Sequence, residues 1–239
     1  MKDRLPTLAA LRRELTRAAN PERARNPIWF KTAKGDYAEG DKFIGILVPT
    51  LRTIARGYEH LKLAEIEKLL ASRIHEYRYA GLLILVSHYE AANRGVRQEV
   101  FDFYIAHTRY INNWDLVDTS APYIVGEHLL HRSRRVLYRL ADSSVLWERR
   151  IAMVATSAFI LRGDLKDTFN IAKRLLADKH DLIHKATGWM LREAGDHSRP
   201  KLTAFLKRNY SQMPRTALRY AIEHLPELQR KQILKGFFG

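Results

Sequence analysis

Apolar residues recur at helical spacing along almost the whole chain. In Trp147–Arg162 (WERRIAMVATSAFILR) they fall at i, i+3 and i+4 positions, which places them on one helical face. Prolines stand where helices should begin, and Gly57, Gly163 and Gly195 stand where helices should end. Strand alternation is almost absent. The pattern predicts an all-α protein with about a dozen short helices joined by short turns, and it leaves Ala33–Lys42 (AKGDYAEGDK) as the main loop.

The predicted helices also look repetitive. Four of them begin with a polar or aromatic turn and continue into an alanine-rich stripe, and their aligned alanines are Ala80, Ala152, Ala186 and Ala217. The first of the three intervals holds two units, so the period matches a two-helix HEAT-type repeat of ~30–47 residues. An ordinary helical bundle is the alternative. The recurrent spacing favours a curved, right-handed solenoid of HEAT-like repeats, a single domain over residues 1–239, whose concave basic face could follow a duplex.

The charge balance points to a polyanionic partner. The chain has 41 Lys and Arg against 26 Asp and Glu, a formal net charge of +15 and a pI near 10.1. Nucleic acid is the first candidate, an anionic membrane surface the second and an acidic protein the third. No apolar stretch approaches the ~18 residues of a membrane span, so we expect no membrane partner.

The absence of cysteine narrows the chemistry. It excludes disulfides, thiolate zinc sites, iron–sulfur clusters and thiol nucleophiles, and it fits a reducing cytoplasm. The opening MKDRLPTLAALRREL lacks the apolar core of a signal peptide. His180 with His184, and His128 with His131, have the spacing of some zinc pairs, but H-E-x-x-H is absent. We therefore expect an intracellular protein with no metal and no cofactor.

One candidate constellation lies in Asn112–Asp118. If Asn113 caps a helix, Trp114 and Asp118 are four residues apart and share one face. An indole beside a carboxylate can hold a flat or cationic ligand. The competing interpretation is a core tryptophan with a capping aspartate.

Two further candidates lie downstream. Arg150 begins the buried stripe of its helix, so it should pair with an acid or face a phosphate. In Lys185–Glu193 (KATGWMLRE), Gly188 inside a helix costs up to ~1 kcal/mol relative to alanine, which indicates close packing or close approach of a ligand. Trp189 next to it is either core or an aromatic wall.

Taken together, these motifs resemble the AlkD family of bacterial alkylpurine DNA glycosylases. The shared elements are Trp-x-x-x-Asp, a Trp-x-x-Arg helix and Lys-Ala-x-Gly-Trp-x-Leu-Arg-Glu, in this order. Phe43–Arg52 (FIGILVPTLR) also matches the family's N-terminal Leu-Gly-Ile-x-x-Pro-x-x-Arg pattern. The similarity runs from Pro21 to His224, and four motifs in register make it specific.

The resemblance implies a HEAT-like solenoid that cradles duplex DNA and excises 3-methyladenine and 7-methylguanine without flipping the base into a tight pocket. By motif match, Asp118 is the catalytic carboxylate, Trp114 and Trp189 are the aromatic walls at the lesion, and Arg150 lies next to them. Arg52, Lys185 and Arg192 match DNA-binding positions. The family's N-terminal aromatic contact has three candidates here, which are Trp29, Phe30 and Tyr37.

The chemistry supports this assignment independently. A cationic alkylpurine departs as a neutral base and needs no general acid, so the site must stabilise an oxocarbenium-like sugar. One aspartate flanked by two tryptophans supplies a carboxylate and electron-rich faces. We expect a monomeric, monofunctional enzyme acting on alkylated duplex DNA in a bacterial cytoplasm, associated with the nucleoid. A catalytically silent DNA-binding paralogue and a HEAT-type scaffold for acidic proteins are the alternatives.

Overall fold

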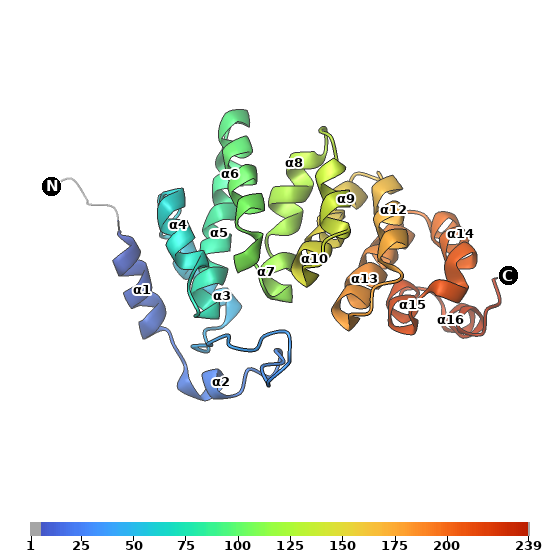
Figure 1. Ribbon diagram of the computed structural model, residues 1–239, viewed down its shortest axis with the longest axis horizontal. Coiled ribbons are helices and arrows are strands. Elements are labelled where there is room, and N and C mark those ends of the chain that lie inside the picture. Colours follow the sequence, from blue (N-terminus) through green and yellow to red (C-terminus); the bar gives the residue numbers. More distant parts are fainter. Residues whose placement is uncertain (1–5, 239) are drawn as a thin grey trace. The chain divides into compact units, whose positions relative to one another are not determined.

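The computed structural model describes residues 6–238, most of which are helical (Figure 1). Within that range there is no β-strand, and Lys42 and Ile74 form one isolated parallel bridge. This confirms the predicted all-α class. The chain divides into two compact units, Met1–Ser120 and Ala121–Gly239.

The first unit is built around one buried helix. Its described elements are α1 (Leu8–Arg17), α2 (Pro21–Arg25), α3 (Val48–Arg56), α4 (Leu63–Leu70), α5 (His75–Ala91), α6 (Arg94–Ala106), the 3-10 turn η1 (Thr108–Tyr110) and α7 (Trp114–Asp118). Helices α3, α4 and α6 pack against α5, and every α5 residue from His75 to Leu82 is buried. A helix that is buried on all sides forms the centre of its unit.

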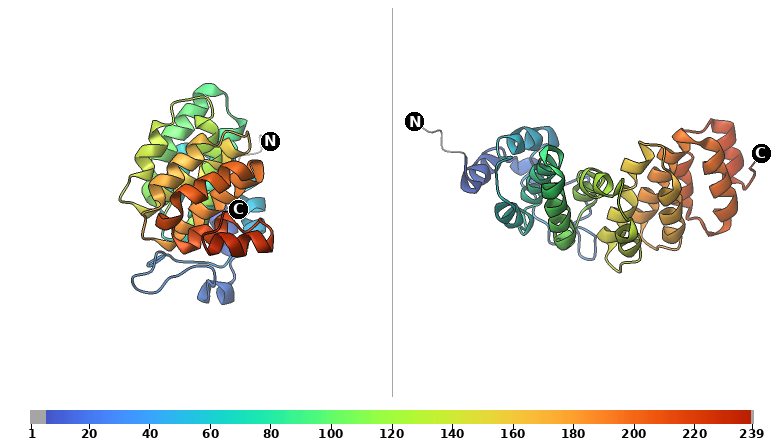
Figure 2. Two further views of the ribbon diagram at one scale, coloured as in Figure 1. Left: turned by 90° about the vertical axis from the view of Figure 1, so that its right-hand side faces the viewer. Right: turned by 90° about the horizontal axis from the view of Figure 1, so that it is seen from above.

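The segment between α2 and α3 contains no helix and runs as a long irregular loop (Figures 1 and 2). It includes Ala33–Lys42, so the predicted loop is confirmed. The loop is attached to the start of α5 by backbone hydrogen bonds, from Lys42 N to the Arg73 carbonyl at 3.0 Å and from His75 N to the Lys42 carbonyl at 2.8 Å. The loop is therefore fixed to the helix that forms the centre of the unit.

The second unit consists of helices in two layers. Its described elements are the π-helical turn η2 (Pro122–Gly126), α8 (Glu127–Leu129), α9 (Arg135–Ala141), α10 (Leu146–Val154), α11 (Ser157–Ile160), α12 (Lys166–Leu175), α13 (Asp181–His197), α14 (Arg199–Asn209), η3 (Tyr210–Gln212), α15 (Arg215–Ala221) and α16 (Glu227–Leu234). Helices α9, α12 and α14 form one layer, and α10, α13 and α15 form the other (Figure 1). In the second layer, α13 packs against both α10 and α15.

Small residues allow the helices of both units to pack closely, as the sequence predicts. Ala80, Ala152, Ala186 and Ala217 are each at most 1% exposed. A Cβ atom on Gly188 would lie 2.5 Å from the Ala217 carbonyl oxygen, so α15 packs directly against the α13 backbone there. The repeated helix pairs of the second unit agree with a two-helix repeat. The curvature and handedness of the solenoid, and its single-domain organisation, stay predictions.

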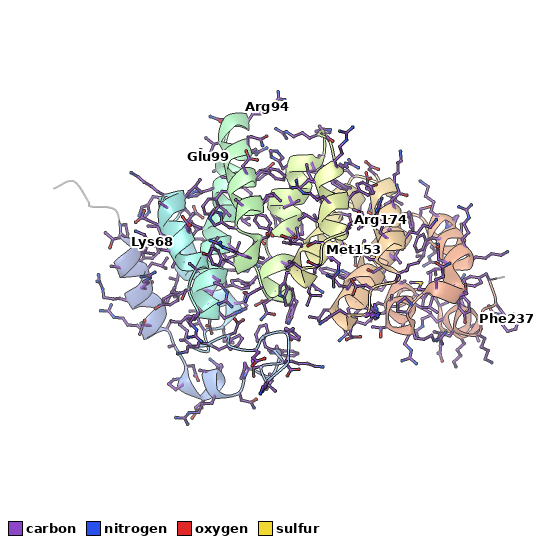
Figure 3. The ribbon with its side chains drawn as sticks, in the orientation of Figure 1. Lys68, Arg94, Glu99, Met153, Arg174 and Phe237 are labelled. Atoms are coloured by element: carbon purple, nitrogen blue, oxygen red, sulfur yellow. The ribbon has the colours of Figure 1, made fainter. Side chains whose placement is uncertain are left out.

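Side chains fill the space between the helices of each unit (Figure 3). Met153 has no exposed surface, whereas Arg94 is exposed and Phe237 is 66% exposed. The core of each unit is therefore aliphatic and aromatic, and the charged residues lie mainly at its surface.

Two local predictions need correction. Gly57 and Gly163 stand at helix ends as predicted, but Gly195 lies within α13. Glycine at this position allows α14 to pack closely against α13, because a Cβ atom there would lie 2.4 Å from Leu202 Cδ2 of α14. The helix predicted over Trp147–Arg162 is also divided into α10 and α11.

The division of that helix falls at Ala155 and Thr156, where η2 comes very close. A Cβ atom on Gly126 would lie 2.3 Å from the Ala155 carbonyl oxygen. Periodicity cannot reveal this interruption, because the apolar stripe continues across it.

Candidate functional site

Helix α7 carries the first candidate pair. The Asn113 side chain accepts a hydrogen bond from Trp114 N at 2.8 Å, and the helix runs from Trp114 to Asp118. The predicted cap and the shared helix are therefore confirmed. A helix of five residues is not stable alone, so contacts from outside determine where these two side chains lie.

A buried ionic network supplies the first of those contacts. His75, the first residue of α5, donates from Nε2 to Asp115 Oδ2 at 2.8 Å, and its Nδ1 lies 3.6 Å from Asp41 Oδ2. Arg78 donates from Nη2 to Asp41 Oδ2 at 2.7 Å. The four side chains are between 4% and 14% exposed. The network joins the loop before α3, the start of α5 and the first turn of α7.

The protonation of the network follows from its geometry. Burial opposes the charge on His75, but hydrogen bonds to Asp115 and Asp41 outweigh it and raise the pKa of His75. Burial also opposes ionisation of Asp41, but His75 and Arg78 hold the pKa of Asp41 below its usual value. With His75 protonated, two cations face two carboxylates, which is the condition for burying these charges together.

Glu76 ties down the loop at a second point. Its carboxylate accepts hydrogen bonds from Ile44 N at 3.0 Å and Gly45 N at 2.7 Å. Gly45 has a φ of 78°, and a Cβ atom there would lie 2.3 Å from the Asn20 carbonyl oxygen. Only glycine fits this backbone, which explains the glycine of the FIGILVPTLR motif.

Aromatic stacking supplies a further contact with α7. The rings of Phe30 and Trp114 are stacked with centroids 5.5 Å apart, and Phe30 also stacks on Phe43 at 4.8 Å. Phe43 in turn stacks on His75 at 4.8 Å. One face of Trp114 is therefore covered by the loop, and its orientation depends on Phe30.

The structure separates the three aromatic candidates in the loop. Phe30 packs on Trp114, and the Tyr37 hydroxyl donates to the Trp29 carbonyl oxygen at 3.2 Å. Trp29 is 74% exposed. It lines a 290 Å³ pocket together with Phe30, Phe43 and the exposed Leu47. Of the three, Trp29 presents most of its surface to solvent.

Asp118 is the last residue of α7, and Arg52 contacts the residue that follows it. Arg52, on α3, donates from Nη2 to Thr119 Oγ1 at 3.4 Å, directly after Asp118. Burial raises the pKa of Tyr104, and the negative charge of Asp118 adds to that shift. Asp118 is therefore within electrostatic reach of a fully buried phenol, and the exposed Arg52 holds a cation at the adjoining surface.

In the second unit, α10 and α13 carry the other candidates. Arg150 is only 5% exposed and donates from Nη1 to the Leu182 carbonyl oxygen at 2.8 Å. The sequence predicts an acid or a phosphate as its partner, and this carbonyl in the first turn of α13 adds a third kind of partner. The hydrogen bond fixes the start of α13 against α10.

Carboxylates accompany the polar candidates of α13. The Trp189 indole donates to Glu193 Oε1 at 3.0 Å, and Arg192 pairs with Glu193 at 3.1 Å and with Glu223. Burial opposes the charge of Arg192, but these two carboxylates outweigh it and raise its pKa. Lys185 pairs with Asp181 at 2.8 Å. Any phosphate that binds Lys185 or Arg192 must share the cation with these carboxylates.

The side chains of His180 and His184 make hydrogen bonds with the backbone. The His180 ring accepts a hydrogen bond from Leu182 N at 3.1 Å, and His184 Nε2 lies 2.6 Å from the Asp178 carbonyl oxygen. Residues 6–238 contain no group of three or more His, Asp or Glu side chains placed to hold a metal ion. No helix in this range is long and apolar enough to cross a membrane.

The ionic network around His75 was not predicted from the sequence. His75 opens the repeated helix that carries Ala80, and Asp115 lies within Asn112–Asp118, but neither of them was assigned a role from the sequence. Asp41 lies in a loop without any recognisable motif. Residues 75 and 78 share the first turn of α5, but nothing in a linear pattern indicates that residues 41 and 115 meet them, because these lie in segments far away in sequence.

Comparison with protein families adds the decisive finding. The family model described as "DNA alkylation repair enzyme" matches residues 11–225. The chain belongs to this family. Among solved structures, a predicted DNA alkylation repair enzyme from Enterococcus faecalis is similar with a TM-score of 0.67 and 17% sequence identity, covering 87% of this chain and 97% of that one. This likeness shows a shared fold. A search of curated proteins found no significant match.

Proposed function

We propose that this member of the DNA alkylation repair family is a monofunctional DNA glycosylase. It hydrolyses the N-glycosidic bond of cationic alkylated purines, 3-methyladenine and 7-methylguanine, in duplex DNA. The observation that carries the proposal is the pair Trp114 and Asp118 on α7, a helix attached by buried ion pairs and stacked rings. Membership of a family of DNA alkylation repair enzymes supports alkylated DNA as the substrate of this pair.

The chemistry needs only a few groups. The alkylated base carries a positive charge and leaves as a neutral molecule, so no general acid is required. The developing oxocarbenium ion needs a carboxylate nearby, and electron-rich aromatic faces stabilise it further. Asp118 supplies the carboxylate and orients the attacking water, which adds to C1′ as the base departs. The water's proton passes to Asp118 and then to solvent.

The other candidates hold the nucleic acid. In this proposal, which follows the motif match, Trp114, Trp189 and Arg150 each act at the deoxyribose and the backbone of the lesion. Arg52, Lys185 and Arg192 bind phosphates. The net charge of +15 supports duplex DNA as the partner. We propose that the enzyme acts as a monomer in the cytoplasm.

The direct test is release of 7-methylguanine from methylated duplex DNA by the wild type and by Asp118→Asn. We expect release by the wild type and a loss of about 100-fold or more in the variant. Duplex binding should stay nearly intact, because the substitution keeps the shape of the side chain. Asp102→Asn is the matched control, since Asp102 is an exposed α6 carboxylate that bonds only Gln98 among the described residues.

The other outcomes separate the alternatives. No release by the wild type, with salt-sensitive duplex binding intact, indicates a catalytically silent DNA-binding paralogue. No release and no salt-sensitive binding indicates a scaffold for acidic proteins. Release that is equal in the wild type and Asp118→Asn removes the carboxylate from the mechanism.

A further inference from the structure

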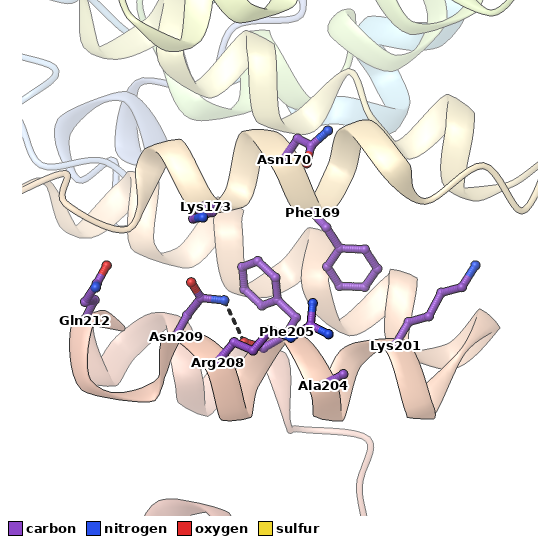
Figure 4. A pocket seen from close by; sticks show the side chains of 9 residues that line it. All are labelled: Phe169, Asn170, Lys173, Lys201, Ala204, Phe205, Arg208, Asn209 and Gln212. Carbon is purple, nitrogen blue, oxygen red and sulfur yellow. Dashed lines mark hydrogen bonds between the residues drawn. The ribbon is translucent and has the colours of Figure 1, made fainter.

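A groove of 580 Å³ lies between α12 and α14 in the second unit, and none of the residues assigned above lines it (Figure 4). Two phenylalanines form its apolar floor. The rings of Phe169 and Phe205 have centroids 5.3 Å apart at a tilt of 36°. Phe205 is 9% exposed, whereas Phe169 is half-buried. Phe169 therefore keeps part of its ring available to a ligand.

The rim of the groove is cationic. Lys173 stands on α12, and Lys201 and Arg208 stand on α14; all three are exposed. None of the lining residues described is acidic. No carboxylate within residues 6–238 forms an ion pair with any of the three cations. The positive charge of this groove is thus left for a partner.

The nearby acid is already engaged. Asp167 is the only acidic residue in the sequence of α12, and α14 contains none. Asp167 accepts a hydrogen bond from Arg134 at 2.6 Å and another from the Tyr138 hydroxyl. It therefore serves the contact between α12 and α9 and does not neutralise the rim.

Amide groups complete the lining. Asn170, Asn209 and Gln212 lie along the same groove (Figure 4). Asn209 donates from Nδ2 to the Phe205 carbonyl oxygen at 2.7 Å, so its amide is fixed. Side-chain amides both donate and accept, which matches the edges of nucleobases.

We propose that this groove binds a short segment of single-stranded nucleic acid. Phosphates contact Lys173, Lys201 and Arg208, and a base stacks on the free part of Phe169. A cationic groove with aromatic rings is the arrangement that binds single strands with little sequence preference. A duplex would offer phosphates to the rim but no exposed base to the apolar floor. An acidic peptide would likewise leave the floor and the amides unused.

The first test uses a fluorescein-labelled oligothymidylate and the full chain, by fluorescence anisotropy over a series of salt concentrations. Lys173→Ala with Lys201→Ala should weaken binding about tenfold and lower the slope of log K against log salt by about 1.4, because each phosphate that is no longer neutralised lowers it by about 0.7. The matched control is Lys179→Ala with Lys207→Ala, two exposed lysines of the same unit outside the groove. Equal weakening by both pairs would overturn the proposal.

A second test depends on the aromatic floor and leaves charge unchanged. Phe169→Leu should weaken oligothymidylate binding about tenfold, because a stacking surface is removed, while binding of an undamaged duplex stays constant. Equal loss for duplex would assign the groove to double-stranded DNA. Polyglutamate can also be added as a competitor of oligothymidylate. If it competes for the wild type but not for Phe169→Leu, the groove would be assigned to an acidic peptide. Either result contradicts the proposal.

Crosslinking locates the bound strand directly. A single strand containing 5-bromouracil should crosslink, on irradiation, to the tryptic peptides 167–173 (DTFNIAK) and 202–207 (LTAFLK), which contain Phe169 and Phe205. Crosslinks confined to other peptides would show that single strands bind elsewhere. The groove variants should release 7-methylguanine from methylated duplex at the wild-type rate, so failure here is distinct from failure of the proposed glycosylase.

Discussion

Trp114 and Trp189, the two tryptophans that we propose to act at the lesion, are held in opposite ways. Trp114 stands on a helix of five residues, and its position comes from Phe30, from the buried pair His75–Asp115 and from a loop far away in sequence. Trp189 stands near the middle of a helix of 17 residues, whose backbone fixes where the side chain leaves the helix, and its indole donates to Glu193 one turn further on. One aromatic wall therefore depends on long-range contacts, and the other depends on regular secondary structure.

The largest effect should follow from breaking the ionic network. His75→Ala leaves Asp41 and Asp115 buried with Arg78 as their only nearby cation in the network. Removing one partner from a buried ion pair costs about 3–5 kcal/mol, and we expect a loss of this size in urea unfolding. His131→Ala, at an exposed position of the second unit, should change nothing. A loss below about 1 kcal/mol for His75→Ala, the size of an exposed pair, would show that the network does not stabilise the first unit.

The corresponding change in the second unit is Gly188→Ala. The new Cβ atom would lie 2.5 Å from the Ala217 carbonyl oxygen and from Tyr220 Cβ, so α13 and α15 must separate. Overpacking of this kind costs about 1–3 kcal/mol. Gly95→Ala is the matched control, since a Cβ atom at that helical position meets nothing closer than 3.6 Å. It should stabilise the protein by up to about 1 kcal/mol through helix propensity. Destabilisation by both changes would refute the packing argument.

The same contrast explains what the sequence could predict. Periodicity, caps and small residues predicted α13, its glycine at a close approach and the cap of α7, because all of these are local. The network of residues 41, 75, 78 and 115 was out of reach, since it depends on how a loop folds over the start of α5. The groove between α12 and α14 was missed for the same reason.

Activity should also distinguish the two tryptophans. Phe30→Leu removes the stacked ring from Trp114 but keeps an apolar side chain, and we expect the rate of 7-methylguanine release to fall about tenfold, since small misplacements cost this much or more. Duplex affinity should hardly change. Unfolding in urea checks that stability falls by no more than about 1–2 kcal/mol. A wild-type rate would mean that Trp114 needs no support from the loop.

A smaller effect is expected for the tether of Trp189. Glu193→Gln weakens the hydrogen bond that the Trp189 indole donates and removes one ion pair of Arg192. The position of Trp189 on α13 does not change. We expect release to fall about two- to threefold, the size of a modest hydrogen-bond contribution. The single-turnover rates of 7-methylguanine release by Phe30→Leu and Glu193→Gln, measured under the same conditions, compare the support of the two tryptophans. If Glu193→Gln were the more damaging change, regular structure would not be what positions Trp189.

The last expected effect is a pH dependence with opposite signs in the two units. The folded-state pKa of His75 is above 6.5, because its carboxylate partners outweigh burial, so its contribution is complete below pH 6.5 and is lost as pH rises through the folded value. Asp41, whose pKa is below 3.8, contributes above pH 3.8 and loses this as pH falls. The network is therefore most stabilising between pH 3.8 and 6.5.

His180 in the second unit behaves in the reverse way. Burial lowers its pKa below 6.5, so its neutral form is favoured in the fold and stability is lost as pH falls through that range. In urea unfolding, His75→Gln should therefore cost more at about pH 5.5 than at about pH 8.5, and His180→Gln should cost more at the higher pH than at the lower. The change is at most about 1.4 kcal/mol per pH unit for one proton. If the stability cost changed with pH in the same direction for both variants, only one of these histidines would titrate as its surroundings require. The two units would then not differ in the charge state of their buried histidine.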